Sequence, residues 1–386
     1  MNYTFLQSIK VIAGNGEVKN VGTLLKEAGY QHPLLVYDKG VEQAGIIHTI
    51  TESLKAEHIT YTEFSKVLPD PPAGIVEEGY QMCLSKNCDS VIAVGGGSSI
   101  DTGKGINLLR VNGGSILEYA DPEKEIKPCA GLISIPTTSG TGSELSNGLI
   151  ISDTKQNKKV AILAQNAMSE FAVIDPSLTL GMPAGLTMMT GLDVFSHAAE
   201  GYTSVLSTIA TDMVCEKIME TVVTYLPKAL ADGQDMEART RMHTAASLGG
   251  FILANASAHV GHSFAHVLGG IYHLPHGACC AYGFPSVLKL IASSCPEKVR
   301  KIGEILGAAF TGTESAEEIG EISASAYMKF RDSILGLKPL EIEEPNIAGL
   351  AKSVMEEPLA ALCPVPIDEK NVLRLLEDVF STQNAG

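Results

Sequence analysis

The sequence predicts an α/β domain over residues 1–182 followed by an all-helical domain over residues 183–386. Two observations carry this prediction: short apolar runs alternate with helical stretches in the first half, and strand signals stop after about Pro183. Continuous apolar strands separated by helices are typical of a parallel sheet that is covered on both faces. A chain of 386 residues also has room for two large domains.

The expected elements follow in chain order. In the first half we expect buried strands at Pro33–Tyr37, Val91–Val94, Leu132–Ile135 and Phe171–Ile174, and helices at Val18–Glu27, Val41–Lys55 and Ile75–Leu84. In the second half, Ala, Leu, Met, Glu and Lys at helical spacing predict helices within residues 186–230, 236–270, 281–309 and 314–334.

The charge balance excludes several classes of partner. Lys and Arg number 28 and Asp and Glu number 44, which gives a net charge of −16. Nucleic acid and anionic lipid both require a basic surface, so we expect neither partner. We expect no secretory signal, and no apolar run reaches the ~20 residues that a membrane-spanning helix needs. Eight cysteines without a CxxC pair indicate reduced thiols in a cytoplasmic protein.

A glycine-rich segment, GGGSSIDTGK at residues 95–104, follows one expected strand and opens a helix. Glycines allow close backbone approach, and a helix N-terminus offers free N–H groups, so a pyrophosphate fits there. It is not a Walker A motif, because Ser98 stands where that motif needs its first glycine. Nor is a Rossmann GxGxxG present, because Gly14-Asn15-Gly16 lacks the third glycine. The alternative is a tight structural turn.

Two further segments suggest a dinucleotide. The polar segment PTTSGTGSE at residues 136–144 follows another strand, where a dinucleotide crevice uses hydroxyls and glycines. Asp38 follows the first strand and can accept hydrogen bonds from ribose hydroxyls while repelling a 2′-phosphate. The alternatives are a solvent-exposed Ser/Thr-rich loop and a turn or cap residue, respectively.

Seven of the ten histidines fall between residues 197 and 276. Asp193 and His197 lie four residues apart, which places them on one helical face. His259, His262 and His266 have the spacing of one face on another helix, and His276 lies between Pro275 and Gly277, which predicts a loop. One carboxylate with several imidazoles suits Fe(II) or Zn(II). The alternative is a set of hydrogen-bonded core or surface histidines.

Taken together, these motifs resemble the iron-containing (group III) alcohol dehydrogenase family nearly from end to end. The specific part is the combination of D-x3-H with H-x3-H-x9-H-G. The resemblance implies a dehydroquinate synthase-like fold, with NAD(H) bound by residues 1–182 and the metal by residues 183–386. It implies metal ligation by Asp193, His197, His262 and His276, and NAD(H) binding by Asp38, Gly96, Gly97, Ser98, Thr137, Thr138 and Lys159. Asp70 departs from the family, where Asn is frequent, and puts a charge near the adenosine side.

The expected activity is NAD(H)-dependent interconversion of small primary alcohols and aldehydes, with Fe(II) or Zn(II) as Lewis acid. His266, one helical turn from His262, is expected to relay a proton or order the pocket. Two alternatives stay open: a polyol, diol or hydroxy-acid dehydrogenase of the same superfamily, and a nucleotide- and metal-binding protein without turnover. We also expect a homo-oligomer, a dimer or larger.

Overall fold

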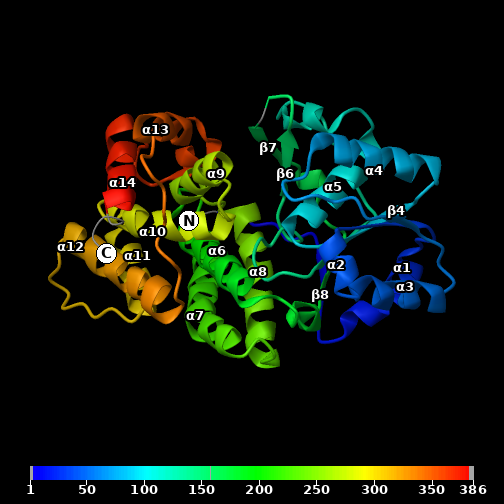
Figure 1. Cartoon of the computed structure of the whole chain (residues 1–386), viewed down its shortest axis with the longest axis horizontal. Coiled ribbons are helices and arrows are strands. Elements are labelled where there is room, and N and C mark those ends of the chain that lie inside the picture. Colours follow the sequence, from blue (N-terminus) through cyan, green and yellow to red (C-terminus); the bar gives the residue numbers. More distant parts are fainter. Residues whose placement is uncertain (1–2, 157, 382–386) are drawn as a thin grey trace. The chain divides into compact units, whose positions relative to one another are not determined.

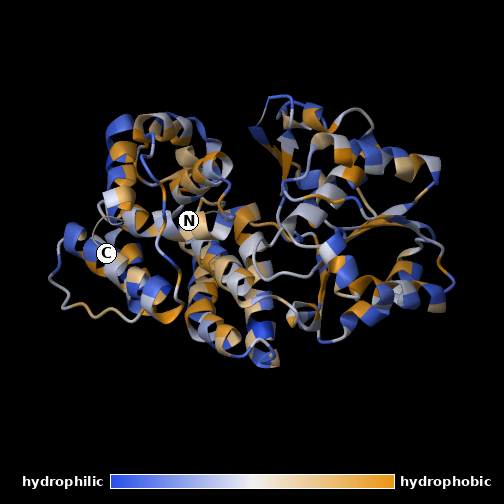
Figure 2. Cartoon of the chain, viewed as in Figure 1, coloured by the Kyte–Doolittle hydropathy of each residue, from blue (hydrophilic) through white to orange (hydrophobic). Residues whose placement is uncertain are grey.

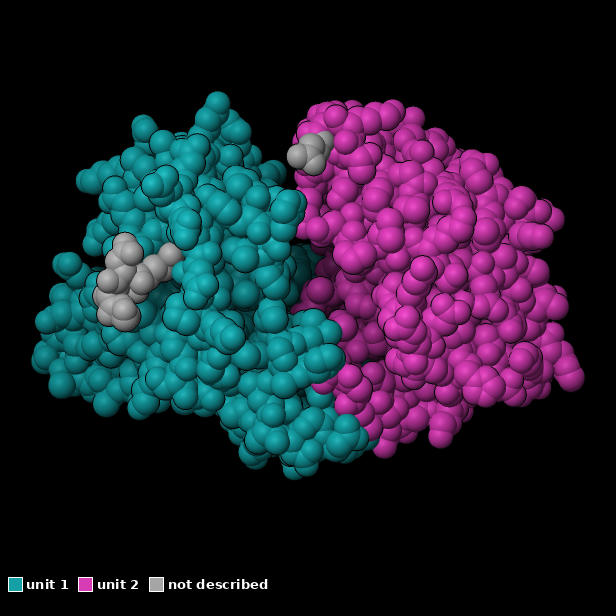
Figure 3. Space-filling view, viewed as in Figure 1, with its two compact units in different colours: residues 1–5, 183–386 teal, residues 6–182 magenta. Residues whose placement is uncertain are grey.

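The computed structural model describes residues 3–156 and 158–381. The chain divides into two compact units, residues 6–182 and residues 1–5 with 183–386 (Figure 3). The first unit holds the strands and the second is helical in its described part (Figure 1). The predicted fold class, an α/β part followed by an all-helical part, is therefore confirmed.

A six-stranded parallel sheet forms the centre of the first unit, in the order β1-β8-β5-β4-β2-β3. The four predicted strands are present as β2 (Pro33–Tyr37), β4 (Ser90–Gly95), β5 (Leu132–Pro136) and β8 (Phe171–Ile174), and all four are buried along their length. The two edge strands, β1 (Lys10–Ala13) and β3 (Thr62–Phe64), were not predicted. Both are short and partly exposed, so they lack a continuous apolar run.

Helices cover both faces of the sheet because successive strand residues point to opposite sides. Leu35 and Ile92 pack on one face with α1 (Val21–Ala28) and α3 (Ile46–Ala56). Leu34, Val91 and Ala93 pack on the other face with α4 (Ala73–Ser85) and α5 (Gly97–Asn112). Short elements complete this part: η1 (Glu17–Asn20), α2 (Lys39–Gln43) and η2 (Ile116–Ala120). The single helix predicted over Val41–Lys55 is wrong, because Gly45, at φ 74°, separates α2 from α3.

An antiparallel hairpin of β6 (Gly148–Asp153) and β7 (Lys158–Leu163) follows β5 and was not predicted. The buried Lys104 of α5 holds its start, because Nζ donates to the carbonyl oxygens of Ser146 at 2.9 Å and Gly148 at 2.7 Å. Two short turns, η3 (Gln165–Ala167) and η4 (Pro176–Thr179), flank β8. Lys104, which ends the glycine-rich segment, therefore has a structural role.

Helices pack around one hydrophobic core in the second unit. They are α6 (Ala184–Thr203), α7 (Ile209–Ala231), α8 (Met236–Asn255), α9 (Val260–Tyr272), α10 (His276–Ile291), α11 (Pro296–Ile305), α12 (Ala316–Met328), the π-helical η5 (Lys329–Ile334), α13 (Ile347–Glu356), η6 (Pro358–Leu362) and α14 (Glu369–Ser381). Their sequences mix hydrophobic and hydrophilic residues, as Figure 2 shows for α14. Three of the long predicted segments each break into two helices. None of the helices in the described ranges is both long and apolar enough to span a membrane.

Candidate metal centre and cofactor loops

Helix α6 carries three acidic or imidazole side chains on one face: Asp193, His197 and Glu200. Their spacing of four and then three residues places them along a single stripe of the helix. All three are almost fully buried, with exposed fractions of 4%, 3% and 0%. A buried stripe of this composition needs partners from neighbouring helices.

Helices α9 and α10 supply these partners. His262 lies on α9, and His276 and Cys280 lie one turn apart at the start of α10. Two glycines permit the close approach of the helices. A Cβ atom at Gly277 would lie 2.0 Å from the backbone oxygen of Met189 on α6, and one at Gly261 would lie 2.5 Å from Oε1 of Glu200.

The donor atoms converge on Oδ1 of Asp193. The Nε2 atoms of His197, His262 and His276 lie 3.5, 3.6 and 3.5 Å from it. The four side chains implied by the family resemblance are thus brought together. Sulfur of Cys280 lies 3.7 Å from the same oxygen, and the sequence analysis did not single out this cysteine.

Glu200 orients His262 from the side opposite the cluster. Oε1 of Glu200 lies 2.7 Å from Nδ1 of His262, and Oε2 accepts hydrogen bonds from the backbone N–H groups of His259 and His262. With Nδ1 engaged by a carboxylate, Nε2 faces the cluster, which is the usual arrangement of a metal-ligating histidine. Sequence reasoning also missed Glu200, whose role depends on how α9 packs on α6.

The electrostatics of the cluster favour a bound cation. Burial alone would raise the pKa of the Asp193 carboxyl, but the nearby His197, His276 and His262 hold it well below its usual range. Burial also opposes ionisation of Glu200, yet His262 and His259 lower its pKa to about 2. Burial lowers the pKa of His197 to about 4, so that its imidazole is neutral at pH 7. Within the described residues, neither carboxylate pairs with a lysine or arginine.

The residues present fit a transition-metal ion. Separations of 3.5–3.6 Å exceed the ~2.7–3.2 Å of a hydrogen bond. Two nitrogen or oxygen donors that share one ion at ~2.0–2.2 Å in tetrahedral geometry lie ~3.3–3.6 Å apart. Asp193, His262 and His276 are therefore spaced as ligands of one ion rather than as hydrogen-bonded pairs, and His197 lies at the same distance from Asp193.

The structure places His259 and His276 differently from the sequence prediction. His259 does not share a helical face with His262, because it precedes α9 and its Nε2 lies 2.9 Å from Oγ1 of Thr203. His276 is the first residue of α10 rather than a loop residue, because Pro275 supplies the N-cap position. His266 stacks on His276 with ring centroids 5.3 Å apart, and its Nδ1 lies 3.3 Å from Oε2 of Glu357.

The predicted cofactor residues of the first unit gather at the carboxyl ends of neighbouring strands. Asp38 follows β2, Gly96 and Gly97 follow β4, and Thr137 and Thr138 follow β5. The two loops are in contact: a Cβ atom at Gly97 would lie 2.9 Å from the side chain of Thr141. Asp38 accepts hydrogen bonds from the Val41 N–H at 3.0 Å and from the Ser99 hydroxyl at 3.1 Å.

At this edge of the sheet, the connections that follow neighbouring strands turn to opposite faces. From β2 the chain crosses through α3 on one face to β3, whereas from β4 it crosses through α5 on the other face to β5. Nucleotides bind at the carboxyl ends of strands where the connections diverge in this way. Asp38 and the N-terminus of α5 flank this divergence, and the half-buried Gly96, Gly97 and Ser98 form the first turn of that helix.

Lys159, the remaining predicted cofactor residue, lies on a different element from the others. It lies on β7, is exposed, and its Nζ forms a 2.6 Å ion pair with Oδ1 of Asp70. Asp70, which stands where Asn is frequent in the family, is therefore paired with the basic side chain of Lys159. Asp70 itself adopts φ 48°, a left-handed conformation that Asn and Asp tolerate better than other side chains.

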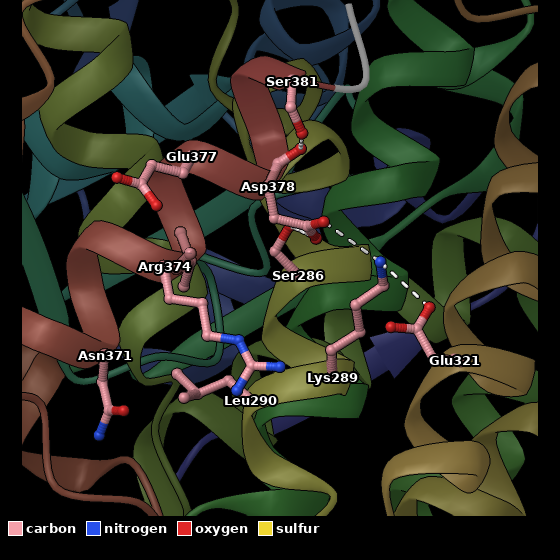
Figure 4. A pocket seen from close by; sticks show the side chains of 10 residues that line it. Ser286, Lys289, Leu290, Glu321, Asn371, Arg374, Glu377, Asp378 and Ser381 are labelled. Carbon is pink, nitrogen blue, oxygen red and sulfur yellow. Dashed lines mark hydrogen bonds and ion pairs between the residues drawn. The ribbon is translucent and has the colours of Figure 1, made fainter. Parts of the chain in front are cut away.

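A separate pocket of about 270 Å³ lies among α10, α12 and α14 (Figure 4). Lys289 at its centre pairs with Asp378 and Glu321, each at 3.2 Å, and Ser286 donates to Asp378 at 2.6 Å. Its charges are thus largely matched to one another, and its lining contains none of the residues of the candidate metal site.

Comparison with known proteins finds relatives that match nearly the whole chain. Residues 8–176 match the family described as iron-containing alcohol dehydrogenase, and residues 187–380 match its C-terminal domain. The NAD-dependent methanol dehydrogenase of Bacillus methanolicus is 34% identical over 92% of this chain and 94% of its own. The choline dehydrogenase of Bacillus subtilis is 34% identical over 95% and 92%. The crystal structure of a 1,3-propanediol oxidoreductase superposes with a TM-score of 0.92 at 29% identity, covering 98% of this chain and 100% of the other.

The orientation of His262 by Glu200 can be tested by Glu200→Gln. We expect metal affinity to fall ~10- to 100-fold, because the carboxylate that fixes the ring and supplies charge is lost. Metal titration of the apoprotein measures the dissociation constant. Glu220→Gln, at an exposed position on α7, is the matched control and should change nothing. Equal affinity of Glu200→Gln and wild type would show that Glu200 has no part in metal binding.

Proposed function

The chain belongs to the iron-containing alcohol dehydrogenase family and is an NAD-dependent alcohol dehydrogenase, and we propose that its substrates are small primary alcohols and the corresponding aldehydes. The family resemblance drawn from the motifs is thereby confirmed. The names of its relatives refer to methanol, choline and 1,3-propanediol, all of which are primary alcohols. These relatives are enzymes matched over nearly their full length, which favours catalysis over a binding module without turnover.

The observation that carries the proposal is the convergence of three imidazoles on the carboxylate of Asp193. We assign the metal to Asp193, His197, His262 and His276, within residues 183–386. We assign NAD(H) binding to residues 1–182, through Asp38, Gly96, Gly97, Ser98, Thr137, Thr138 and Lys159. Iron and NAD(H) are the cofactors of the family, and Zn(II) is an alternative occupant of the same nitrogen and oxygen donors.

When bound, the metal supplies a Lewis acid for the substrate oxygen, and NAD(H) carries the hydride. The chain's own residues provide orientation and proton transfer. Glu200 keeps the proton of His262 on Nδ1, so that Nε2 remains available. His266 can hold or release a proton near His276, because its side chain is 24% exposed and contacts the carboxylate of Glu357. The N-terminus of α5 can hold the pyrophosphate through its free N–H groups.

We also propose a cytoplasmic homo-oligomer, a dimer or larger. All eight cysteines are free thiols, as in a reducing compartment. Four exposed apolar side chains lie in the loop after α6 and in the first turns of α7: Val205, Leu206, Ile209 and Met213. Such a cluster is costly to leave in water and favours self-association. Light scattering of the purified protein measures the assembly, and a monomer at all concentrations would contradict it.

Removing the metal tests the proposed function directly. We expect a chelator to abolish NADH oxidation with short aldehydes, and Fe(II) or Zn(II) to restore it, because the substrate oxygen then regains its Lewis acid. The His262→Ala, His276→Ala double variant should bind no metal and show no turnover, whereas His48→Ala, an exposed residue of α3, is the control. Full activity of the metal-free double variant would overturn the proposal. A panel of short alcohols, diols and hydroxy acids ranks the substrates and tests the diol and hydroxy-acid alternatives.

Asp38 should make the enzyme prefer NAD(H) over NADP(H). Asp38→Asn keeps an acceptor for the Val41 N–H but removes the charge that repels a 2′-phosphate. We expect the NADPH to NADH ratio of kcat/KM to rise ~10- to 100-fold, equivalent to about 1–3 kcal/mol. Asp121→Asn, at an exposed position of the same unit, is the control. If the wild type uses both cofactors equally, or if the ratio does not move, Asp38 only caps α2.

His266 should act on the proton and not on the metal. We expect His266→Ala to keep full metal occupancy while kcat falls by about 10²-fold, the scale of a lost acid–base group. His273→Asn is the matched control, since His273 is exposed at the end of α9 and Asn tolerates its φ of 54°. Metal analysis and steady-state kinetics on the same preparations decide the outcome. Loss of metal from His266→Ala would make His266 a ligand and contradict the assignment.

A further inference from the structure

Cys280 lies within the donor cluster, although the family resemblance implies a ligand set of one aspartate and three histidines. It follows His276 by one turn of α10, so that both side chains leave the helix on the same face. Its exposed fraction is 2%. Its sulfur lies 3.6 Å from Nε2 of His276, 3.7 Å from Oδ1 of Asp193 and 3.9 Å from Nε2 of His262.

These separations match those of a sulfur that shares an ion with nitrogen and oxygen donors. Metal–sulfur bonds of ~2.3 Å and metal–nitrogen bonds of ~2.0–2.1 Å place the two donors ~3.6 Å apart at a tetrahedral angle. Among the described residues, Asp193, His262, His276 and Cys280 form a quartet whose donor atoms all lie within 4.8 Å of one another. The cysteine is therefore as well placed as the two histidines of the quartet.

We propose that Cys280 is a sulfur ligand of the metal, as a fifth donor beside Asp193, His197, His262 and His276. This inference rests on the proposed metal site and deepens it, because it changes the chemistry of the donor set. A thiolate favours the borderline and soft ions Zn(II) and Co(II) over hard ions such as Mn(II). The remaining interpretation of the same distances is a weak hydrogen bond from the thiol to Oδ1 of Asp193 or to an imidazole.

The adjacent cysteine offers a matched control. Cys279 is the next residue of α10, is fully buried, and belongs to the hydrophobic core rather than to the donor quartet. Cys279→Ala and Cys280→Ala therefore remove the same atoms from neighbouring positions of one helix. Cys280→Ser provides a second variant that keeps the volume and polarity of the site, should the alanine variant fold poorly.

The experiment is an anaerobic Co(II) titration of the apoprotein, followed by absorption spectroscopy, and needs no turnover. Visible cobalt bands report that the ion is bound, and a sulfur-to-cobalt charge-transfer band in the near ultraviolet reports a thiolate ligand. We expect both in wild type and Cys279→Ala, and only the visible bands in Cys280→Ala and Cys280→Ser. We also expect loss of Cys280 to weaken Co(II) binding by more than the ~10- to 100-fold that a lost neighbour of a ligand costs.

Two results would overturn the inference, and they are distinguishable. Visible bands without the ultraviolet band in wild type, or an ultraviolet band that persists in both Cys280 variants, would exclude Cys280 as a ligand while leaving the metal site intact. Absence of all cobalt bands in wild type would overturn the metal site itself, and with it both the proposed function and this inference.

Discussion

Two buried carboxylates whose only basic partners in the described chain are imidazoles are the constraint on which the helical unit depends. Asp193 and Glu200 are ionised and almost fully enclosed, and their ion-pair contacts in the described chain are all with imidazoles. Burying charge that is not fully paired costs free energy. The packed helices α6, α9 and α10 are therefore most stable when a cation is held among the imidazoles. Metal binding and the stability of this helix cluster are therefore coupled.

The first unit is organised by a different constraint, which is the direction of the backbone at the ends of parallel strands. After β2 and β4 the chain leaves toward opposite faces of the sheet. The turn at the end of β4 leaves little room for side chains. Gly95 adopts φ 143° with the Ser99 side chain beside it, a conformation and a space that exclude an L side chain. The glycine-rich segment is thus both a structural turn and the start of a helix that can receive a phosphate, so that the two interpretations of this motif are compatible.

Sequence reasoning succeeded where the signal is local. Continuous apolar runs identified the four central strands, and the spacing of Asp193 and His197 identified a shared helical face. It failed where tertiary contacts decide. Glu200 becomes a partner of His262 only when α9 packs on α6, and Cys280 lies in an apolar helix where a cysteine usually serves as a small hydrophobic residue. The β6–β7 hairpin was missed because its outer strand is largely exposed.

The central claim is that one metal ion binds the side chains of the α6, α9 and α10 cluster. It is tested most directly by anomalous X-ray diffraction from crystals of the metal-reconstituted protein, measured at the absorption edge of the ion. The account predicts a single strong anomalous peak within bonding distance of Oδ1 of Asp193 and of the Nε2 atoms of His197, His262 and His276. Crystals of active, metal-containing enzyme whose only anomalous peak lies away from these atoms would contradict it.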